Sequence, residues 1–114
     1  MNKNNIADLS VSSDHSIFLF ANGDVYTMGT NTFMKLGRNT SERISYGAIN
    51  KPRVGTVIQV GTIRYLTYVV YKDAIYVIGN CEHGLCGQKD GKAIESQTND
   101  WIQIDLSSIP NLTI

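Results

Sequence analysis

Short apolar runs separated by turn residues dominate the first part of the chain. Residues 17–20 and 25–28 are apolar runs, and residues 21–24, with the sequence Ala-Asn-Gly-Asp, lie between them. An Asn-Gly step between two apolar runs is a strong short-range signal for a β-hairpin, because glycine enters positive φ at little cost. The pattern therefore predicts a hairpin whose tight turn contains Gly23.

Similar strand signals continue through the second half. Residues 67–71 and 75–78 are apolar runs around a turn at 72–74, which predicts a second hairpin of the same size. Residues 101–106 alternate between apolar and polar side chains, as a strand with one wet face does. No segment shows the apolar stripe of an amphipathic helix.

The chain also repeats itself. Residues 25–29 align with residues 75–79 at an offset of fifty, and residues 6–9 align with residues 57–60 at an offset of fifty-one. The difference predicts that the second hairpin turn is one residue shorter than the first. A period near fifty with four short strands per unit is typical of β-propeller blades.

A glycine-rich motif recurs with this period. The first copy runs from a histidine through a strand and a glycine turn to a pattern Tyr-x-x-Gly-x-Asn, which is followed by Leu-Gly, and its members are His15, Gly23, Tyr26, Gly29, Asn31, Leu36 and Gly37. Met34 stands where the pattern has its middle glycine. The second copy keeps Tyr76, Gly79, Gly84 and Gly87, with Cys81 and Cys86 at the Asn31 and Leu36 positions and Tyr65 or Leu66 at the histidine position. The motif resembles the regulator of chromosome condensation repeat family, and the resemblance implies propeller blades with the histidine in blade packing.

We therefore expect an all-β chain of two β-propeller blades, each a four-stranded antiparallel sheet. Repeat one is expected over about residues 6–55 and repeat two over about residues 56–108. Residues 109–114 resemble the opening strand of each repeat and are expected to complete a blade. Because propellers close at about four to eight blades, closure requires oligomerisation or a partner, and three head-to-tail copies would make a six-bladed ring.

Composition narrows the function classes. The 114 residues are 42% hydrophobic and 18% charged, which fits one globular unit. A net charge of zero argues against nucleic-acid binding and against an anionic membrane surface. The polar N-terminal residues lead us to expect a chain without a standard secretion signal. Cys81 and Cys86 have only His83 as a further ligand and a long spacing for zinc, so we expect no metal site and two small, partly buried thiols rather than a redox pair.

Charge is distributed unevenly along the chain. Residues 33–54 contain five basic residues and one acidic residue, whereas residues 73–105 contain six acidic and two basic residues. One interpretation is two solvated loops that happen to differ in charge. The other is that the acidic blade of one subunit docks beside the basic blade of another. The candidate interface residues are Lys35, Arg38, Arg43, Lys51, Arg53, Glu82, Asp90, Glu95, Leu112 and Ile114.

No residue set has the pattern of an active site. His15 has no serine or cysteine nucleophile at a recognisable spacing. The glycines of the motif are expected at strand ends rather than in a phosphate cradle, and Tyr26 and Tyr76 are expected in blade packing. We therefore expect neither enzymatic activity nor a cofactor.

The favoured function is a non-enzymatic structural or protein-interaction module that acts as a homo-oligomeric propeller. A two-repeat chain rich in Asn and Ile suggests a bacteriophage virion component (a decoration, collar or fibre-associated protein) assembled in the host cytoplasm, and otherwise a cytoplasmic protein. One alternative is a guanine-nucleotide-exchange or chromatin-type binding propeller, as the resemblance implies. Another is a two-blade oligomeric lectin with a carbohydrate ligand, against which the single Trp101 counts.

Overall fold

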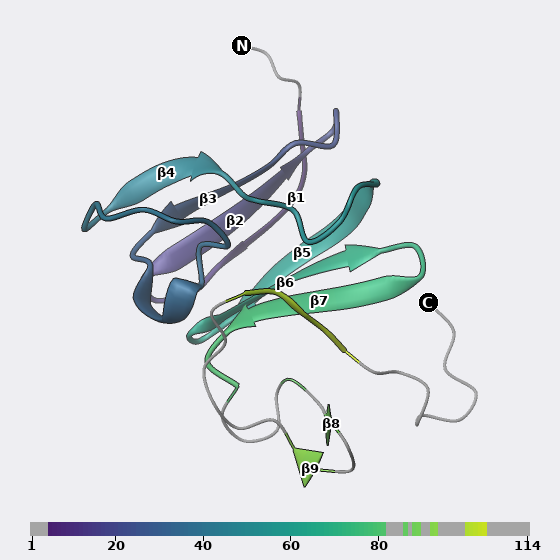
Figure 1. Ribbon diagram of the computed structural model, residues 1–114. Coiled ribbons are helices and arrows are strands. Elements are labelled where there is room, and N and C mark those ends of the chain that lie inside the picture. The colour runs from purple at the N-terminus through teal and green to yellow at the C-terminus, as the bar shows by residue number, and fades with distance from the viewer. Residues whose placement is uncertain (1–4, 82–85, 87, 90–91, 94–99, 105–114) are drawn as a thin grey trace.

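Two four-stranded antiparallel sheets lie against each other in the computed structural model (Figure 1). The structure describes residues 5–81, 86, 88–89, 92–93 and 100–104. Blade one is the sheet β1-β2-β3-β4, formed by β1 (Ile6–Val11), β2 (His15–Phe20), β3 (Val25–Gly29) and β4 (Ser45–Ala48). Blade two is the sheet β10-β7-β6-β5, formed by β5 (Val57–Ile63), β6 (Leu66–Tyr71), β7 (Ala74–Gly79) and β10 (Ile102–Gln103). The expectation of two four-stranded antiparallel blades is confirmed.

Smaller elements connect these strands. A 3₁₀ turn, η1 (Thr32–Met34), follows β3, and a two-stranded sheet pairs β8 (Gln88–Lys89) with β9 (Lys92–Ala93). The predicted strand at 101–106 is observed as β10, which pairs with Val77 and Tyr76 of β7. Residues 105–114, with Leu112 and Ile114, lie outside the described residues. Within the described part of the chain, no helix is long and apolar enough to cross a membrane.

The two blades share one hydrogen-bonding register. His15 pairs with Gly29 in blade one, and Leu66 pairs with Gly79 in blade two. Leu66 therefore occupies the histidine position, which the sequence left open between two residues. Tyr71 pairs with Ala74, so the second hairpin turn is one residue shorter than the first, as predicted.

A bulge at the same place in both first strands strengthens this equivalence. The register of β1 shifts between Ile6 and Asp8, and the register of β5 shifts between Val57 and Gln59. A bulge bends its strand and increases the local twist. Because the two bulges align, the two sheets are bent alike and can stack as consecutive blades.

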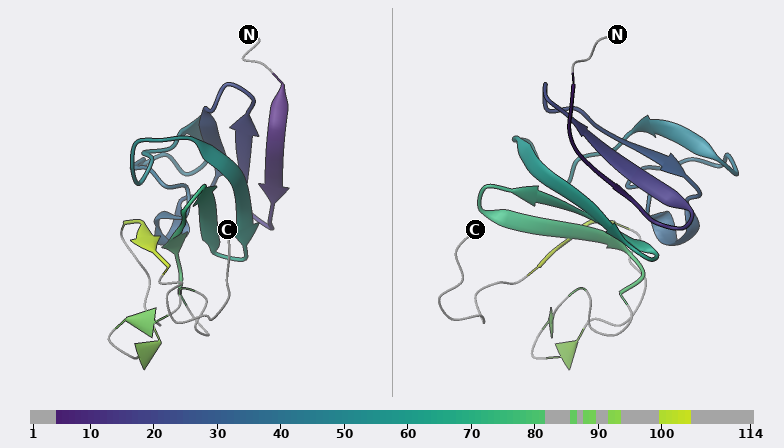
Figure 2. Two further views of the ribbon diagram at one scale, coloured as in Figure 1. Left: turned by 90° about the vertical axis from the view of Figure 1, so that its right-hand side faces the viewer. Right: turned by 180° about the vertical axis from the view of Figure 1, so that it is seen from behind.

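The main core lies between the blades. Figure 2 shows β1 and β2 of blade one next to β5 of blade two. Alternate residues of a strand point to opposite faces, so one face of β2 and β3 turns toward blade two. The buried cluster between the sheets contains Ile17, Leu19, Val25, Ile49, Val57, Val60, Val69 and Tyr71.

Tyr26 corrects one expectation about this core. Residues 17, 19 and 25 are buried, but Tyr26, which was expected in blade packing, is only half-buried. It follows Val25 directly in β3 and therefore points to the opposite face of the sheet. Apolar runs alone do not tell which of two faces another blade covers.

Candidate interaction faces of the two blades

Polar contacts join the inner faces of the two blades at their first strands. The backbone N–H of Val60 donates to Asp8 Oδ2 at 3.0 Å. The hydroxyls of Ser10 and Thr62 lie 2.8 Å apart, and the N–H of Thr62 donates to Ser10 Oγ at 3.0 Å. These bonds fix the position of β1 along β5, because a slip by one residue would break all of them.

His15 continues this contact at the second strands. Its Nε2 lies 2.8 Å from Thr67 Oγ1, and its Nδ1 lies 2.8 Å from Ser12 Oγ. The Thr67 hydroxyl also lies 2.5 Å from the Lys35 carbonyl oxygen, to which it donates. Nε2 of His15 therefore carries the proton and Nδ1 accepts from Ser12. Burial first, and then the charge of Lys35, lower the pKa of His15 to about 4, while Asp14 opposes them.

Lys35 differs from its expected role as a surface interface residue. Its side chain is completely buried, and its Nζ donates to Thr30 Oγ1 at 2.9 Å and lies 3.5 Å from Asp14 Oδ1. Burial lowers the pKa of Lys35, and Asp14 opposes the shift. A lysine in this place holds the loop after β3 against the blade junction rather than facing another protein.

The loop after β3 is tied by an asparagine in blade one. Asn31 Oδ1 accepts from the N–H of Leu36 at 3.0 Å, and Asn31 Nδ2 donates to the Arg38 carbonyl at 2.9 Å. Met34 has a φ of 62°, so it adopts the left-handed conformation that the motif assigns to glycine. Met34 therefore has a φ that glycine adopts more easily than methionine does, at the position where the pattern has its middle glycine.

In blade two, a disulfide joins the two equivalent loop positions. Cys81 and Cys86 are bonded to each other, with their Cα atoms 5.2 Å apart. Both are fully buried, so the expectation of partly buried free thiols was wrong. The physical reason is that the Cα atoms of these two positions lie within the range that a disulfide spans. Gly84 and Gly87 of the same loop lie outside the described residues.

Two glycines of the motif allow the backbone to approach closely at the ends of β3 and β7. Gly29 has a φ of 126°, and a Cβ there would lie 2.3 Å from the Asp14 carbonyl oxygen. Gly79 has a φ of 132°, and a Cβ there would lie 2.2 Å from the Tyr65 carbonyl oxygen. No other residue fits either position without a backbone shift.

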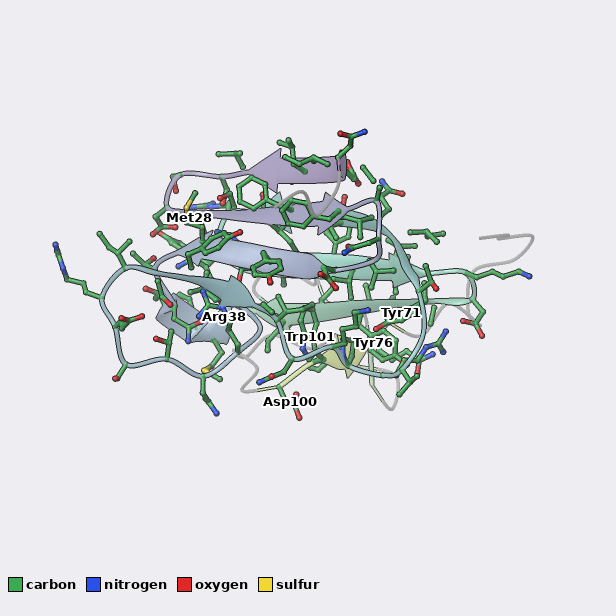
Figure 3. All side chains as sticks on the ribbon, turned by 90° about the horizontal axis from the view of Figure 1, so that it is seen from above. Met28, Arg38, Tyr71, Tyr76, Asp100 and Trp101 are labelled. Carbon is green, nitrogen blue, oxygen red and sulfur yellow. A yellow bond between two sulfur atoms is a disulfide. The ribbon has the colours of Figure 1, made fainter. Side chains whose placement is uncertain are left out.

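Trp101 anchors blade two to blade one, a role that the sequence did not indicate. Its Nε1 donates to the Asn50 carbonyl at 2.8 Å, and its ring would lie 2.6 Å from a Cβ on Gly37. Figure 3 shows Trp101 beside Tyr76 and Tyr71. In the register that aligns Ala48 of β4 with Gln103 of β10, Trp101 corresponds to Tyr46. Aligning the fourth strands of the repeats would have found this signal.

The outer face of blade one, turned away from blade two, is apolar and exposed. We define it by the large apolar residues on the side of the sheet opposite to Ile17 and Leu19, namely Ile6, Leu9, Val11, Phe18, Phe20, Tyr26, Met28 and Tyr46. Five of these, at positions 6, 9, 11, 28 and 46, are between 42% and 68% exposed. Tyr26 stacks on Tyr46 with ring centroids 5.3 Å apart, and Phe20 meets Tyr26 edge to face at 5.6 Å.

The shared register identifies an equivalent face on blade two, and that face is covered. Leu9, Phe20, Tyr26 and Tyr46 align with Val60, Tyr71, Tyr76 and Trp101 of blade two. Blade one packs against that set within the chain. The outer face of blade one is therefore the exposed equivalent of an inter-blade contact surface.

The basic residues of the expected interface are partly engaged within the chain. Arg38 is half-buried and donates to Ser45 Oγ at 2.8 Å and to Thr27 Oγ1 at 3.2 Å. Arg53 forms an ion pair with Asp73, an acidic residue of blade two. The opposite charges of the two regions thus meet within one chain at this point.

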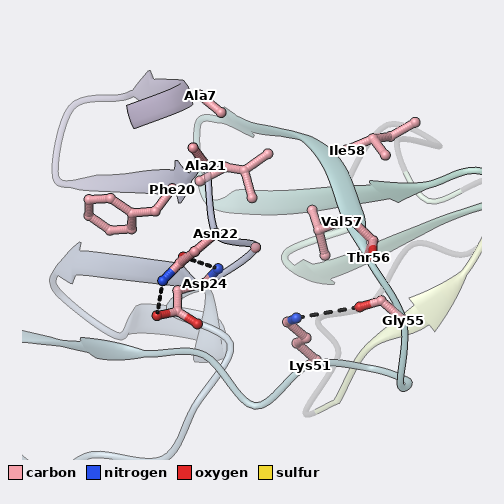
Figure 4. A pocket seen from close by; sticks show the side chains of 12 residues that line it. Ala7, Phe20, Ala21, Asn22, Asp24, Lys51, Gly55, Thr56, Val57 and Ile58 are labelled. Atoms are coloured by element: carbon pink, nitrogen blue, oxygen red, sulfur yellow. Dashed lines mark hydrogen bonds between the residues drawn. The ribbon is translucent and has the colours of Figure 1, made fainter. Parts of the chain in front are cut away.

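Lys51, Arg43 and the acidic candidates complete this set. Lys51 is exposed, donates to the Gly55 carbonyl at 3.4 Å and lines a cavity beside the turn of Asn22 and Asp24 (Figure 4). Arg43 is exposed in the loop before β4. Glu82, Asp90 and Glu95 lie outside the described residues. Of the basic candidates, Arg43 and Lys51 are thus exposed, while Lys35 is buried and Arg38 and Arg53 have partners within the chain.

Residues 6–33 match the family model for the regulator of chromosome condensation (RCC1) repeat. This segment has the sequence pattern of an RCC1 repeat. The match covers β1 to η1, including His15, Gly29 and Asn31, and blade two shares its register. No curated protein matches the sequence.

Solved structures with a similar fold match this chain over both blades. Human WBSCR16 is 18% identical with a TM-score of 0.71, over 92% of this chain and 29% of that one. Prp20p from Saccharomyces cerevisiae, studied for its binding to Gsp1p and histones, is 16% identical with a TM-score of 0.72, over 96% and 27%. Yeast RCC1 (Prp20) bound to Kap60 is 18% identical with a TM-score of 0.63, over 85% and 24%. This chain thus spans less than a third of each of these proteins.

Proposed function

We propose that the chain is a non-catalytic protein-interaction module, formed by two RCC1-type blades that work after further blades complete the propeller. The exposed outer face of blade one carries this proposal. Its equivalent on blade two is covered by blade one, and an exposed apolar surface of this kind marks an interaction site. The further blades are supplied by identical chains in head-to-tail order.

Residues at aligned positions support a copy of the chain as the neighbour. Trp101 fits against Gly37 because glycine has no Cβ. In a second joint, Tyr46 takes the place of Trp101, and the residue aligned with Gly37 is also a glycine, Gly87. A tyrosine of one copy can therefore approach the neighbouring backbone in the same way.

Several positions of that joint lack polar side chains where the internal joint has them. Ser10 and Thr62, which are hydrogen-bonded within the chain, align with Gly61 and Val11. His15 aligns with Leu66, which is buried on the far side of blade two. A joint between copies would thus rest on apolar burial, which contributes about 25 cal/mol per Å².

Three copies would make a six-bladed ring, provided that the rotation per chain closes the circle. The boundaries of the two repeats, the role of residues 109–114 and a place in a virion stay predictions. Gsp1p, histones and Kap60 are named with yeast Prp20, of which this chain spans 24% to 27%, and no contact described above favours them for this chain.

Sedimentation equilibrium of the wild type and two variants tests the proposal. Tyr46→Lys places a charge on the outer face, whereas Val54→Lys does the same at a linker residue that is 97% exposed. We expect the wild type and Val54→Lys to associate equally, and Tyr46→Lys to be monomeric with an unchanged far-UV circular dichroism spectrum. A wild-type monomer at micromolar concentration would contradict homo-oligomeric closure.

A further inference from the structure

An edge-to-face aromatic pair occurs once in each blade at aligned positions. Phe20 and Tyr26 have ring centroids 5.6 Å apart at an interplanar angle of 87°. Tyr71 and Tyr76 have centroids 5.6 Å apart at an angle of 80°. Both pairs sit at the hairpin-turn ends of the second and third strands of their blades. The two blades therefore present the same aromatic corner.

In blade two, an arginine occupies this corner. The guanidinium carbon of Arg53 lies 4.5 Å from the Tyr71 ring centroid and 5.9 Å from the Tyr76 centroid. Asp73 in the adjacent turn pairs with the same guanidinium, and the Tyr71 hydroxyl donates to the Arg53 carbonyl at 2.8 Å. A guanidinium over aromatic rings is a favourable cation–π arrangement, to which the carboxylate adds a charge-assisted hydrogen bond.

In blade one, no cation of the described residues occupies the same corner. Among the described residues, no lysine or arginine lies over Phe20 or Tyr26. Tyr46 stacks on Tyr26 and extends the aromatic surface. The adjacent turn holds Asn22, which aligns with Asp73 and donates to the carboxylate of Asp24 at 3.2 Å. The blade-one corner thus offers the rings of Phe20 and Tyr26, which Tyr46 extends.

A second copy of the chain would not fill this corner with arginine. In the register that aligns Ile49 with Ile104, Arg53 aligns with Ser108. Arg53 itself lies at the rim of the blade junction, with 36% of its side chain exposed. The equivalent corner of blade one would therefore stay accessible from the rim even in a closed ring.

We propose that Phe20 and Tyr26 form a guanidinium-binding site for an arginine side chain of a different protein. The arginine binds as Arg53 binds on blade two, with its planar group over the ring pair. It lacks the hydrogen bond from a tyrosine hydroxyl to its carbonyl, because Phe20 replaces Tyr71. This proposal concerns the rim of the outer face and does not depend on the neighbour being a copy.

Titration of the labelled wild-type protein with short peptides, followed by NMR of aromatic ring signals, tests the site. The probes are acetyl-Gly-Arg-Gly-amide and the same peptide with lysine or with neutral citrulline in place of arginine. We expect saturable shifts of the Phe20 and Tyr26 rings with the arginine peptide, and an affinity for the lysine peptide that is roughly threefold lower. We expect no saturable shift with citrulline. Equal shifts with the arginine and citrulline peptides would overturn the proposal.

Three variants sharpen the test. Phe20→Leu should abolish the shift of Tyr26, whereas Phe18→Leu, on the same face but outside the ring pair, should leave binding unchanged. Phe20→Tyr restores the hydroxyl of the blade-two corner and should tighten arginine binding roughly fivefold, the size of one net hydrogen bond. Arginine binding that survives Phe20→Leu in a folded protein would show that the ring pair is not the site.

Discussion

The two blades share a backbone register but tie the same loop by different chemistry. In blade one, Asn31 accepts a hydrogen bond from Leu36. In blade two, the equivalent residues are Cys81 and Cys86, and a disulfide joins them. The two repeats thus connect the same two loop positions but use different bonds to do so.

Aligned positions on the faces through which blades contact each other also carry different residues in the two blades. The inner face of blade one uses Asp8, Ser10 and His15 to bond to blade two. The aligned residues of blade two are Gln59, Gly61 and Leu66. The joint within the chain therefore adds polar hydrogen bonds to an apolar core, while the surface of any second joint is mainly apolar.

The largest expected effect separates the inner from the outer face of blade one. Leu19→Asp places a carboxylate in the core between the blades and should abolish folding, because an unpaired buried charge costs more than a small domain's typical stability margin. Leu9→Asp, on the exposed outer face, should fold normally. Circular dichroism melting of both variants measures this difference. A cooperative, wild-type-like melt for Leu19→Asp would contradict the assignment of the core.

The polar joint should make stability depend on pH. The pKa of His15 is about 4 in the folded protein against 6.5 as the ordinary value, so the unfolded chain binds the proton more readily. The stabilisation from neutral His15 is complete above pH 6.5 and falls by about 3 kcal/mol as the pH decreases to about 4. Urea unfolding of the wild type and of His15→Asn at several pH values tests this.

In that comparison, the variant should be less stable at pH 7 and should lose less stability toward pH 4. Leu66, at the aligned position of blade two, carries no titratable group, so Leu66→Met should keep the wild-type pH profile. Parallel pH profiles for the wild type and His15→Asn would exclude His15 as the source of the pH dependence.

The disulfide of blade two and the Asn31 hydrogen bonds of blade one should differ in their contribution to stability and in their sensitivity to reductant. Removing the disulfide with Cys81→Ser and Cys86→Ser together should cost about 2 kcal/mol, the loop-closure value for so short a loop. Asn31→Ala should cost about 1 kcal/mol. A reducing agent should lower the melting temperature of the wild type and of Asn31→Ala but not of the double serine variant. Thermal melts that reductant leaves unchanged in all three proteins would argue against the disulfide.

The smallest expected effect distinguishes the two hairpin turns. Gly23 has a φ of 94° and open space around its Cβ position, so Gly23→Ala should cost about 1 kcal/mol from backbone strain alone. Lys72, in the shorter turn, is not in the left-handed region, and Lys72→Ala should be nearly neutral. Denaturant midpoints of the two variants measure the difference. Equal midpoints would remove the distinction between the turns.

The strands, the hairpins and the period could be predicted because they depend on local apolar runs and turn residues. The sequence could not show the disulfide, since its formation depends on the distance between Cys81 and Cys86 in the folded chain. The sequence also misplaced Lys35. A charged side chain is expected at the surface, but Lys35 Nζ contacts Asp14 and Thr30 at the blade junction. Trp101 and Tyr46 were missed because only the first three strands of the repeats were aligned.

Hydroxyl-radical footprinting over a dilution series tests the central claim, that the outer face of blade one is an inter-blade contact surface. The account predicts that Met28 and Tyr46 are protected at high protein concentration and become reactive on dilution, while Val54 in the linker stays reactive throughout. Met28 and Tyr46 that react at the same rates at every concentration, without protection relative to Val54, would contradict it.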